Sequence, residues 1–380
     1  MIQGVEVLLN WSIQPVYEQL RGDAIGLRAS MAISAAPKGG NMEEIIGFEA
    51  LYESAMKCKK GVIWKDSVAH YILNIIEETI KLEEQLKTGS YRPRPLKPFT
   101  VDSCGKKRTV MGVAFRDRVY QRSLNDNAIY PAMTKGFVYD NGACQKNKGT
   151  NFSRDRLDCF LHRFFRKHGT NGFVLQCDIK GYYPNMRHDV VEATFKKRLA
   201  PEVFRRACEI MKQQYFGDVG YLPGSQMIQI AGISVLDGMD HYIKERLRIK
   251  YYIRYMDDFI LIHEDKEYLE KCRDELVKYL EPMGFELHPK KTKIYPITEG
   301  IKFLGFIFRL TNSGKVVRTV LPKNVKNYRR KLFRLVRLAK KGRISREKVD
   351  ECYRSWRAHA EKGNSHNLLK RMDAYYRSLW

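Results

Sequence analysis

Two adjacent acids, Asp257 and Asp258, interrupt the apolar stretch IRYMDDFILI at residues 253–262. The apolar residues on either side predict two strands over residues 251–263, joined at the acids. Burial of an unpaired charge costs several kcal/mol or forces the group to neutralise. The two carboxylates must therefore lie at an exposed hairpin tip or face a cation.

A third acid, Asp178, ends the apolar segment FVLQCDI, which is predicted to be a strand over residues 173–179. Asp178 and Asp257 at the ends of neighbouring strands would form a site with only oxygen ligands. Such a site suits Mg²⁺, which takes one or two carboxylates together with phosphate oxygens and water. Two ions about 4 Å apart can activate a hydroxyl and stabilise a leaving oxygen in phosphoryl transfer. The simpler alternative is that the acids occupy turns and helix caps, where Asp is common.

The net charge of the chain indicates what kind of partner it binds. It carries 68 Lys and Arg against 43 Asp and Glu, a formal net charge of +25. A surplus this large favours a polyanionic partner, most often nucleic acid, over a simple solubility role. No apolar run approaches the length of a membrane span and the N-terminus lacks an export signal, so we expect a cytoplasmic protein. The eight cysteines include no CxxC pair, which argues against a zinc site or a disulfide framework.

Helical and strand patterns alternate irregularly along the chain, which predicts an α+β fold rather than a doubly wound sheet. Residues 66–87 show the period of an amphipathic helix, with Asp66 or Ser67 as its cap. Residues 99–113 predict two short strands around a basic glycine turn. Further helices are predicted over residues 116–133, 188–199, 233–248 and 267–284.

A series of short motifs surrounds the acids in a fixed order. They are GKKRTV (105–110), FVYDNGACQKNKGT (137–150), CDIKGYY (177–183), GSQMIQ (224–229), YMDD (255–258), HPKKTK (288–293) and KFLGF (302–306). In this order and spacing the chain resembles bacterial reverse transcriptases, the group that includes retron, group II intron, diversity-generating retroelement and defence-associated enzymes. The resemblance covers residues 90–310 with specific motifs and residues 311–380 more loosely.

The resemblance implies a right-hand polymerase with fingers, a palm built from an antiparallel sheet plus helices, and a helical thumb. The domains would be an N-terminal leader (1–45), fingers and the start of the palm (46–170), the palm with the catalytic motifs (171–310) and a basic helical thumb (311–380). It also implies RNA-directed DNA synthesis with two Mg²⁺ ions, for which Mn²⁺ could substitute.

The resemblance assigns roles in catalysis and metal binding to five positions. Asp178 and Asp257 would bind both metal ions, with Asp258 adjacent and less directly ligating. Ile179 would contribute its backbone carbonyl. Lys291 would protonate the departing pyrophosphate, and a surface salt bridge is the alternative role for this lysine.

The resemblance also assigns nucleotide-binding positions. Lys107 and Arg108 would meet the incoming triphosphate, Arg108 through its two-pronged guanidinium group. Tyr183 would exclude a ribose 2′-OH, although core packing alone could explain a ring at this position. Gln226 and Gln229, in the GSQMIQ segment, would lie near the nucleotide.

Two parts of the chain would hold the primer and template. Phe303, Leu304 and Gly305 would grip the primer end. From Lys323 to Arg346 the chain carries basic residues and no acid. Here an apolar stripe at helical spacing predicts a core face, formed by Val325, Tyr328, Leu332, Leu335 and Ala339. A second face would contact a duplex backbone rather than only solvent, through Arg330, Arg334, Arg337 and Lys341.

Two positions depart from the family pattern. Ile228 stands where the diversity-generating branch has Ser, and Pro223 stands where many relatives have Gln. Both departures bear on the sub-branch and on fidelity rather than on polymerase chemistry.

The expected partners are a cognate structured RNA as template, its cDNA product and dNTPs, in antiphage defence or in a retroelement. A mutagenic diversity-generating enzyme, an RNA-synthesising polymerase and an RNA-binding, maturase-like protein are the alternatives. We expect neither an RNase H domain nor an endonuclease cluster, so template removal would need another enzyme.

Overall fold

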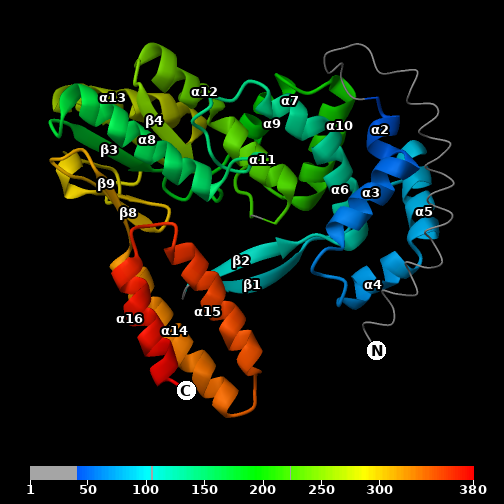
Figure 1. Cartoon of the computed structure of the whole chain (residues 1–380). Helices are drawn as coiled ribbons and strands as arrows, with labels where there is room; N and C mark the ends of the chain where they lie inside the picture. Colours follow the sequence, from blue (N-terminus) through cyan, green and yellow to red (C-terminus); the bar gives the residue numbers. More distant parts are fainter. Residues whose placement is uncertain (1–40, 104–105, 223) are drawn as a thin grey trace, which may run out of the picture. The chain divides into compact units, whose positions relative to one another are not determined.

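The acids lie at the strand ends of a four-stranded antiparallel sheet in the order β4-β5-β3-β6. Strands β3 and β4 of this sheet are labelled in Figure 1. Its strands are β3 (Phe173–Asp178), β4 (Tyr251–Tyr255), β5 (Asp258–His263) and β6 (Lys293–Pro296). The strands expected over residues 173–179 and 251–263 are thereby confirmed. The structure is a computed structural model that describes residues 41–103, 106–222 and 224–380, without the side chains of residues 102–108.

Helices cover both faces of this sheet. Successive residues of a strand point to opposite faces. On one face Val174 shares a core with α8 (Thr150–His168). On the other face Leu175 shares a core with α13 (Lys266–Leu280), the helix expected over residues 267–284. Because helices cover both faces of the sheet, the strands are apolar on both sides. The carboxylates therefore lie at the ends of the strands.

The chain before the sheet is mainly helical and carries one hairpin. The hairpin expected over residues 99–113 is confirmed, and its strands pair from Lys97↔Gly112 to Ser103↔Lys106. The single helix expected over residues 66–87 is wrong, because the helix breaks at Asn74, where φ is −108° and ψ is 32°. The elements are α2 (Glu43–Ile46), α3 (Phe48–Cys58), α4 (Asp66–Leu73), α5 (Ile75–Lys87), β1 (Lys97–Ser103), β2 (Lys106–Gly112), α6 (Phe115–Leu124), a π turn (Asn125–Ile129) and α7 (Tyr130–Thr134).

The expected cap of this first helix is also wrong. Lys65 occupies the N-cap position of α4, and no side chain caps the helix there. Asp66 therefore lies in the first turn, where its negative charge still favours the positive end of the helix dipole.

A group of helices lies between β3 and β4 in sequence. α11 is apolar along most of its length and lies in the core, with Ile228, Ala231 and Ile233 fully buried. The single helix expected over residues 233–248 is instead formed by the end of α11, by α12 and by a π turn. The elements are α9 (His188–Lys196), α10 (Pro201–Gln214), α11 (Gln226–Val235), α12 (Asp237–His241) and the π turn (Tyr242–Arg246).

The C-terminal part combines a small sheet with three helices (Figure 1). The sheet has the order β7-β8-β9, with β7 (Ile301–Phe303), β8 (Phe306–Leu310) and β9 (Val316–Val320). α14 (Pro322–Lys340), α15 (Arg346–Ala360) and α16 (His366–Ser378) share an apolar core. The apolar stripe expected on α14 is confirmed, because all five of its residues belong to this core or pack against it.

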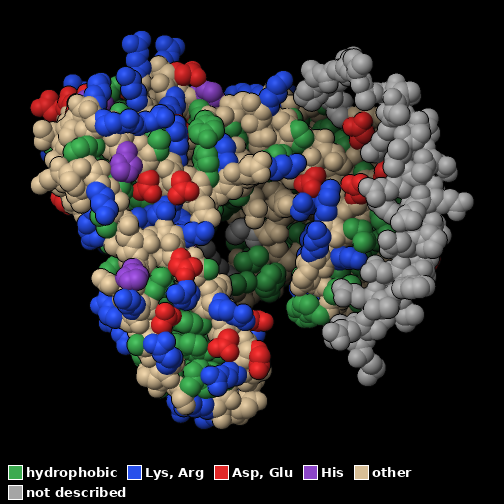
Figure 2. Space-filling view, viewed as in Figure 1, with side chains coloured by type: hydrophobic (Ala, Val, Ile, Leu, Met, Phe, Trp, Pro, Cys, Tyr) green, Lys and Arg blue, Asp and Glu red, His purple; other side chains and the backbone are tan. Residues whose placement is uncertain are grey.

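Helices and antiparallel sheets together make the fold α+β, as expected. On the visible face of the described residues, Lys and Arg side chains are widely spread (Figure 2). No helix in the described part of the chain has the length and apolar character needed to cross a bilayer. Because the positive charge is spread out, the overall charge distribution alone does not locate a selective anion site.

Candidate active site

The β4–β5 hairpin places Asp257 at its tip. Tyr255 pairs with Asp258, so Met256 and Asp257 form the two-residue turn between the strands. Met256 has φ of +59°, the left-handed conformation that tight hairpin turns favour. The carbonyl oxygen of Asp257 accepts a hydrogen bond from the backbone N–H of Ile179, at 3.2 Å. The tip is thereby joined to the end of β3.

Asp178, the last residue of β3, lies directly opposite Asp258 in the strand register. Opposed residues of an antiparallel pair project from the same face, so the two carboxylates are neighbours. Burial raises the pKa of Asp258 to about 7, and the nearby charges of Asp178 and Asp257 act in the same direction. Placing like charges together without a permanent cation is unfavourable, so this edge of the sheet attracts cations.

Lys291 supplies one such cation. Its Nζ lies 2.8 Å from Oδ1 and 2.9 Å from Oδ2 of Asp178. Both side chains line a pocket of about 440 Å³, beside Asp258 and further lysines. The other lining residues are Gln176, Lys290, Lys293, Tyr295, Glu299, Gly300 and Lys302. The ammonium groups of this pocket favour an anionic ligand, and the adjacent carboxylates favour cations that bind together with it.

The donor set fits a divalent metal ion only in part. Within the described ranges, no three His, Cys, Asp or Glu side chains form a ready metal-binding cluster. Mg²⁺, however, needs only one or two protein carboxylates when phosphate oxygens and water complete its shell. Asp178, Asp258 and the turn residue Asp257 offer that chemistry, with Ile179 beside them.

The predicted nucleotide-binding residues fall into two groups. The side chains of Lys107 and Arg108 lie outside the described part of the chain. Tyr183 is half-buried, and its hydroxyl would lie 2.8 Å from a Cβ placed on Gly232 of α11. A glycine at that position therefore lets the ring lie close to the helix. Burial raises the pKa of Tyr183, which keeps the hydroxyl neutral.

Helix α11 orients the GSQMIQ segment. Ser225 caps the helix by accepting a hydrogen bond from the N–H of Ile228. Gln226 and Gln229 are exposed on one face, whereas Ile228 is fully buried on another. The departure at Ile228 is therefore a feature of the core. Pro223 lies outside the described residues.

The predicted primer grip is a second tight hairpin. Leu304 and Gly305, with φ of +44° and +88°, form the turn between β7 and β8. Phe303 is 1% exposed and packs in the core. Contact with a primer at this hairpin would therefore come from the turn rather than from the Phe303 ring.

The basic residues predicted for the thumb lie on α14 and at its end. All four side chains are exposed, and their spacing places them on one side of the helix, away from the buried Leu332 and Val336. These residues are Arg330, Arg334, Arg337 and Lys341. The structure brings Asp178, Asp258 and Lys291 into one pocket, and these four cations belong to a separate surface.

Sequence reasoning missed Arg254 and Gln176. Arg254 is fully buried within β4 and donates a hydrogen bond from Nη1 to the carbonyl oxygen of Met256, at 3.0 Å. Gln176 lines the pocket and accepts a hydrogen bond from the hydroxyl of Tyr295, at 2.9 Å. A charged residue in the middle of an apolar strand was the available signal for Arg254.

Comparison with known proteins identifies the class. The family model for reverse transcriptase (RNA-dependent DNA polymerase) matches residues 95–308. The match covers more than half of the chain, so the chain belongs to the reverse transcriptase family. The description of this family is that of RNA-dependent DNA polymerases, which agrees with the expected enzyme class. The match identifies the family as a whole and does not assign a bacterial group within it.

Two solved structures show a limited similarity to this chain. Apo telomerase from Candida tropicalis, truncated from the C-terminal domain, is 15% identical with a TM-score of 0.45, over 61% of this chain and 58% of that one. Telomerase from Candida albicans, in complex with a TWJ fragment of telomeric RNA, is 11% identical with a TM-score of 0.46, over 70% of this chain and 55% of that one. The chain thus spans a little over half the length of these proteins. No curated protein matches the chain.

Proposed function

We propose that the pocket beside Asp178 and Asp258 is the polymerase active site, and that the enzyme copies a dedicated structured RNA into cDNA. The observation that carries the site assignment is the direct pairing of Asp178 with Asp258, with Lys291 bound to Asp178. A protein that only bound RNA would gain nothing from clustered carboxylates near a phosphate backbone.

Asp178, Asp257 and the carbonyl of Ile179 would hold the divalent ions in this proposal. When bound, such ions activate the primer 3′-OH and stabilise the leaving pyrophosphate. The hydrogen bond from Ile179 to the Asp257 carbonyl fixes the spacing between the end of β3 and the turn. Asp258 supports the site from the neighbouring strand position.

Lys291 would change partners during the reaction. It now neutralises Asp178, and a metal ion at Asp178 would replace it there. The released ammonium group would remain in the pocket, close to the phosphates of an incoming nucleotide. From that position Lys291 could donate a proton to the departing pyrophosphate, as a general acid does.

Tyr183 would select the sugar. Its ring lies against Gly232 of α11 and is half-buried, so it has little freedom to move aside. A rigid ring beside the nucleotide would collide with a ribose 2′-OH and accept deoxyribose. Gln226 and Gln229, on the exposed face of the same helix, would contact the nucleotide.

The proposed division into domains follows the same reasoning. Residues 171–310 would form the palm, 46–170 the fingers and the start of the palm, and 311–380 the thumb. Residues 1–45 would be a leader. Arg330, Arg334, Arg337 and Lys341 of the thumb would contact the backbone of the template–primer duplex.

The choice of template is the second part of the proposal. The net charge of +25 gives affinity for RNA but no sequence preference. A structured RNA recognised by its shape and single-stranded loops would supply the selectivity. Antiphage defence and a retroelement are the two settings we propose. Ile228 does not separate them, because its buried side chain faces the core.

Sequencing of the RNA and cDNA that copurify with the chain from its native host tests the template proposal. We expect one dominant RNA and a cDNA complementary to part of it. A sample that mirrors the abundance of cellular transcripts would refute a dedicated template, while leaving the assignment of the active site intact.

A further inference from the structure

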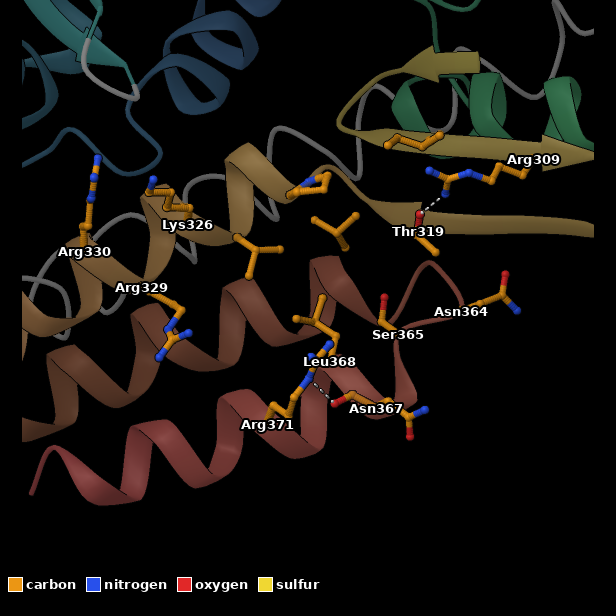
Figure 3. Close-up of a pocket in the computed structure, with 14 residues that line it drawn as sticks. Arg309, Thr319, Lys326, Arg329, Arg330, Asn364, Ser365, Asn367, Leu368 and Arg371 are labelled. Atoms are coloured by element: carbon orange, nitrogen blue, oxygen red, sulfur yellow. Dashed lines mark hydrogen bonds between the residues drawn. The ribbon is translucent and has the colours of Figure 1, made fainter. Parts of the chain in front are cut away.

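A second pocket, of about 600 Å³, lies where the β8–β9 strands meet helices α14 and α16 (Figure 3). It is separate from the pocket of Asp178, with which it shares no lining residue. Five cations line it: Arg309, Lys326, Arg329, Arg330 and Arg371. No carboxylate of the described residues belongs to its lining. A concave surface with this one-sided charge attracts anions more strongly than scattered surface cations do.

Among the residues that the structure describes, the cations of this pocket lack acidic partners. Within the described ranges, none of the five forms an ion pair with Asp or Glu. Three of them are held by other contacts. Arg309 Nη1 donates to Thr319 Oγ1 at 3.2 Å, Arg371 Nε donates to the Asn367 carbonyl at 3.3 Å, and Arg329 lies 4.3 Å from the ring centre of Tyr375. Guanidinium groups oriented in this way keep N–H donors for a ligand.

The N-terminus of α16 opens onto the same pocket. Ser365 occupies the N-cap position, yet its side chain accepts no hydrogen bond from the first turn of the helix. By contrast, Ser345 at the same position of α15 accepts one from the N–H of Lys348. The first backbone N–H groups of α16 therefore keep their donors, and the helix dipole adds positive potential there.

Ser365 is itself an unsatisfied group. It is 4% exposed, and its Oγ has no hydrogen-bond partner among the residues that the structure describes. Figure 3 shows this hydroxyl directed toward the strand that carries Thr319, across the pocket from its own helix. Buried hydroxyl groups in folded proteins almost always have a partner. An oxygen-rich ligand at the helix end would satisfy it.

Part of the remaining lining is apolar. Ile307, Val320, Val325 and Leu368 form this part of the wall. Arg330 at the edge of the pocket begins the basic face of α14. The pocket thus offers a site for negative oxygen beside a site for a flat or apolar group, the two components of a nucleoside phosphate.

We propose that this pocket binds the phosphate of a nucleotide, at the N-terminus of α16, through Ser365, Arg371 and neighbouring cations. Backbone N–H groups at a helix N-terminus together with guanidinium groups form a recurrent phosphate site. The phosphate belongs either to a free nucleotide or to a nucleic-acid strand that continues along α14.

Binding to the full chain in EDTA tests the proposal, with dAMP as the free nucleotide and a ten-nucleotide single-stranded RNA as the strand. Calorimetry measures the first and fluorescence anisotropy the second. Arg371→Gln should weaken binding of at least one probe about tenfold, and Ser365→Ala about threefold. The control Arg354→Gln removes the same charge from α15, outside the pocket, and should change either affinity less than about twofold.

The pattern of losses identifies the source of the phosphate. A loss confined to dAMP indicates a free nucleotide, and a loss confined to the RNA indicates a strand. Hydrogen exchange at the amides of residues 366–368 should slow when the affected probe binds. The proposal is overturned if both probes bind Arg371→Gln and Ser365→Ala like the wild type, or if Arg354→Gln loses as much affinity as Arg371→Gln. A lower melting temperature of Ser365→Ala with unchanged binding would show that this hydroxyl serves only the helix, and would also overturn it.

Discussion

Arg254 joins the buried carboxylate of Asp240 to the turn that carries Asp257. Its Nε and Nη2 lie 2.7 and 2.5 Å from Oδ1 and Oδ2 of Asp240, and its Nη1 donates to the carbonyl oxygen of Met256 at 3.0 Å. Both charged side chains are fully buried. The hydroxyl of Tyr252 also donates to Asp240, so a satisfied polar network holds the turn from below.

Arg254→Lys tests whether this network positions the proposed active site. Lysine keeps the charge but cannot donate to Asp240 and to Met256 with one planar group. We expect the variant to lose about 1–3 kcal/mol of unfolding free energy and to have a kcat for primer extension lower by about tenfold, with little change in the KM for dNTP. Urea unfolding and steady-state kinetics measure the two effects.

Arg198→Lys is the matched control. Arg198 pairs with Asp237 and donates to the carbonyl oxygen of Met133, whereas the Met256 carbonyl accepts from Arg254. Arg198→Lys should lower the unfolding free energy, but its kcat should fall less than that of Arg254→Lys. Equal losses of kcat in both variants would show that the effect is general destabilisation.

Lys291→Ala should change metal dependence and rate in opposite directions. In the proposed active site, the ammonium group of Lys291 would compete with a metal ion for Asp178, with which it forms an ion pair. Its removal should lower the half-saturating Mg²⁺ concentration about threefold, while loss of the proton donor lowers the maximal rate at least about tenfold. Lys290→Ala removes a lysine of the same pocket that has no bond to Asp178, and should change neither quantity much. An unchanged rate in Lys291→Ala would remove the proposed acid role.

Tyr183→Ala should weaken the discrimination against ribonucleotides. Without the ring, a 2′-OH meets no obstacle, and the ratio of kcat/KM for NTP to that for dNTP should rise about tenfold. Tyr182→Phe is the control, because it removes only the hydroxyl that donates to the Gly232 carbonyl and leaves Tyr183 in place. A ratio that stays constant in Tyr183→Ala would assign the ring to core packing alone.

Asp158 gives the fold a pH dependence away from the active site. Burial raises its pKa to about 6, although Arg318 lies 3.3 Å from Oδ2. A carboxyl whose pKa is raised on folding stabilises the protein below its unfolded pKa, and this contribution is lost as the pH rises through 6. The unfolding free energy of the wild type, relative to Asp158→Asn, should therefore fall by about 1 kcal/mol between pH 5 and pH 7.

Asp155→Asn controls for the loss of a contact with Arg318, since Asp155 also pairs with it at 2.9 Å. The difference in unfolding free energy between Asp155→Asn and the wild type should change by less than half as much between pH 5 and pH 7. A pH-independent difference for Asp158→Asn would contradict the buried, protonated state.

The sheet and its acids could be predicted because burial on both faces leaves a strong local signal. Apolar runs that end in Asp178 and Asp257 indicate strands whose ends are polar. The break at Asn74 could not be predicted, because the amphipathic pattern continues through it. The break depends on how α4 and α5 pack, and this packing cannot be read from the amphipathic pattern.

The polar network behind the turn lies beyond sequence reasoning for a similar reason. Arg254 interrupts an apolar strand, which signals a buried charge with a partner somewhere. The partner, Asp240, belongs to α12 and meets Arg254 only in the folded chain. Phe303 was predicted from the sequence to grip the primer, but its ring lies in the core.

Primer extension on an RNA template, with Mg²⁺ and either dNTPs or NTPs, tests the central claim most directly. The wild type should extend the primer with dNTPs in preference to NTPs. A variant that combines Asp257→Ala with Asp258→Ala should keep its circular dichroism spectrum and melting transition, yet extend at least about a thousandfold more slowly. Synthesis at a comparable rate by the folded double variant, or a preference of the wild type for NTPs, would contradict the account.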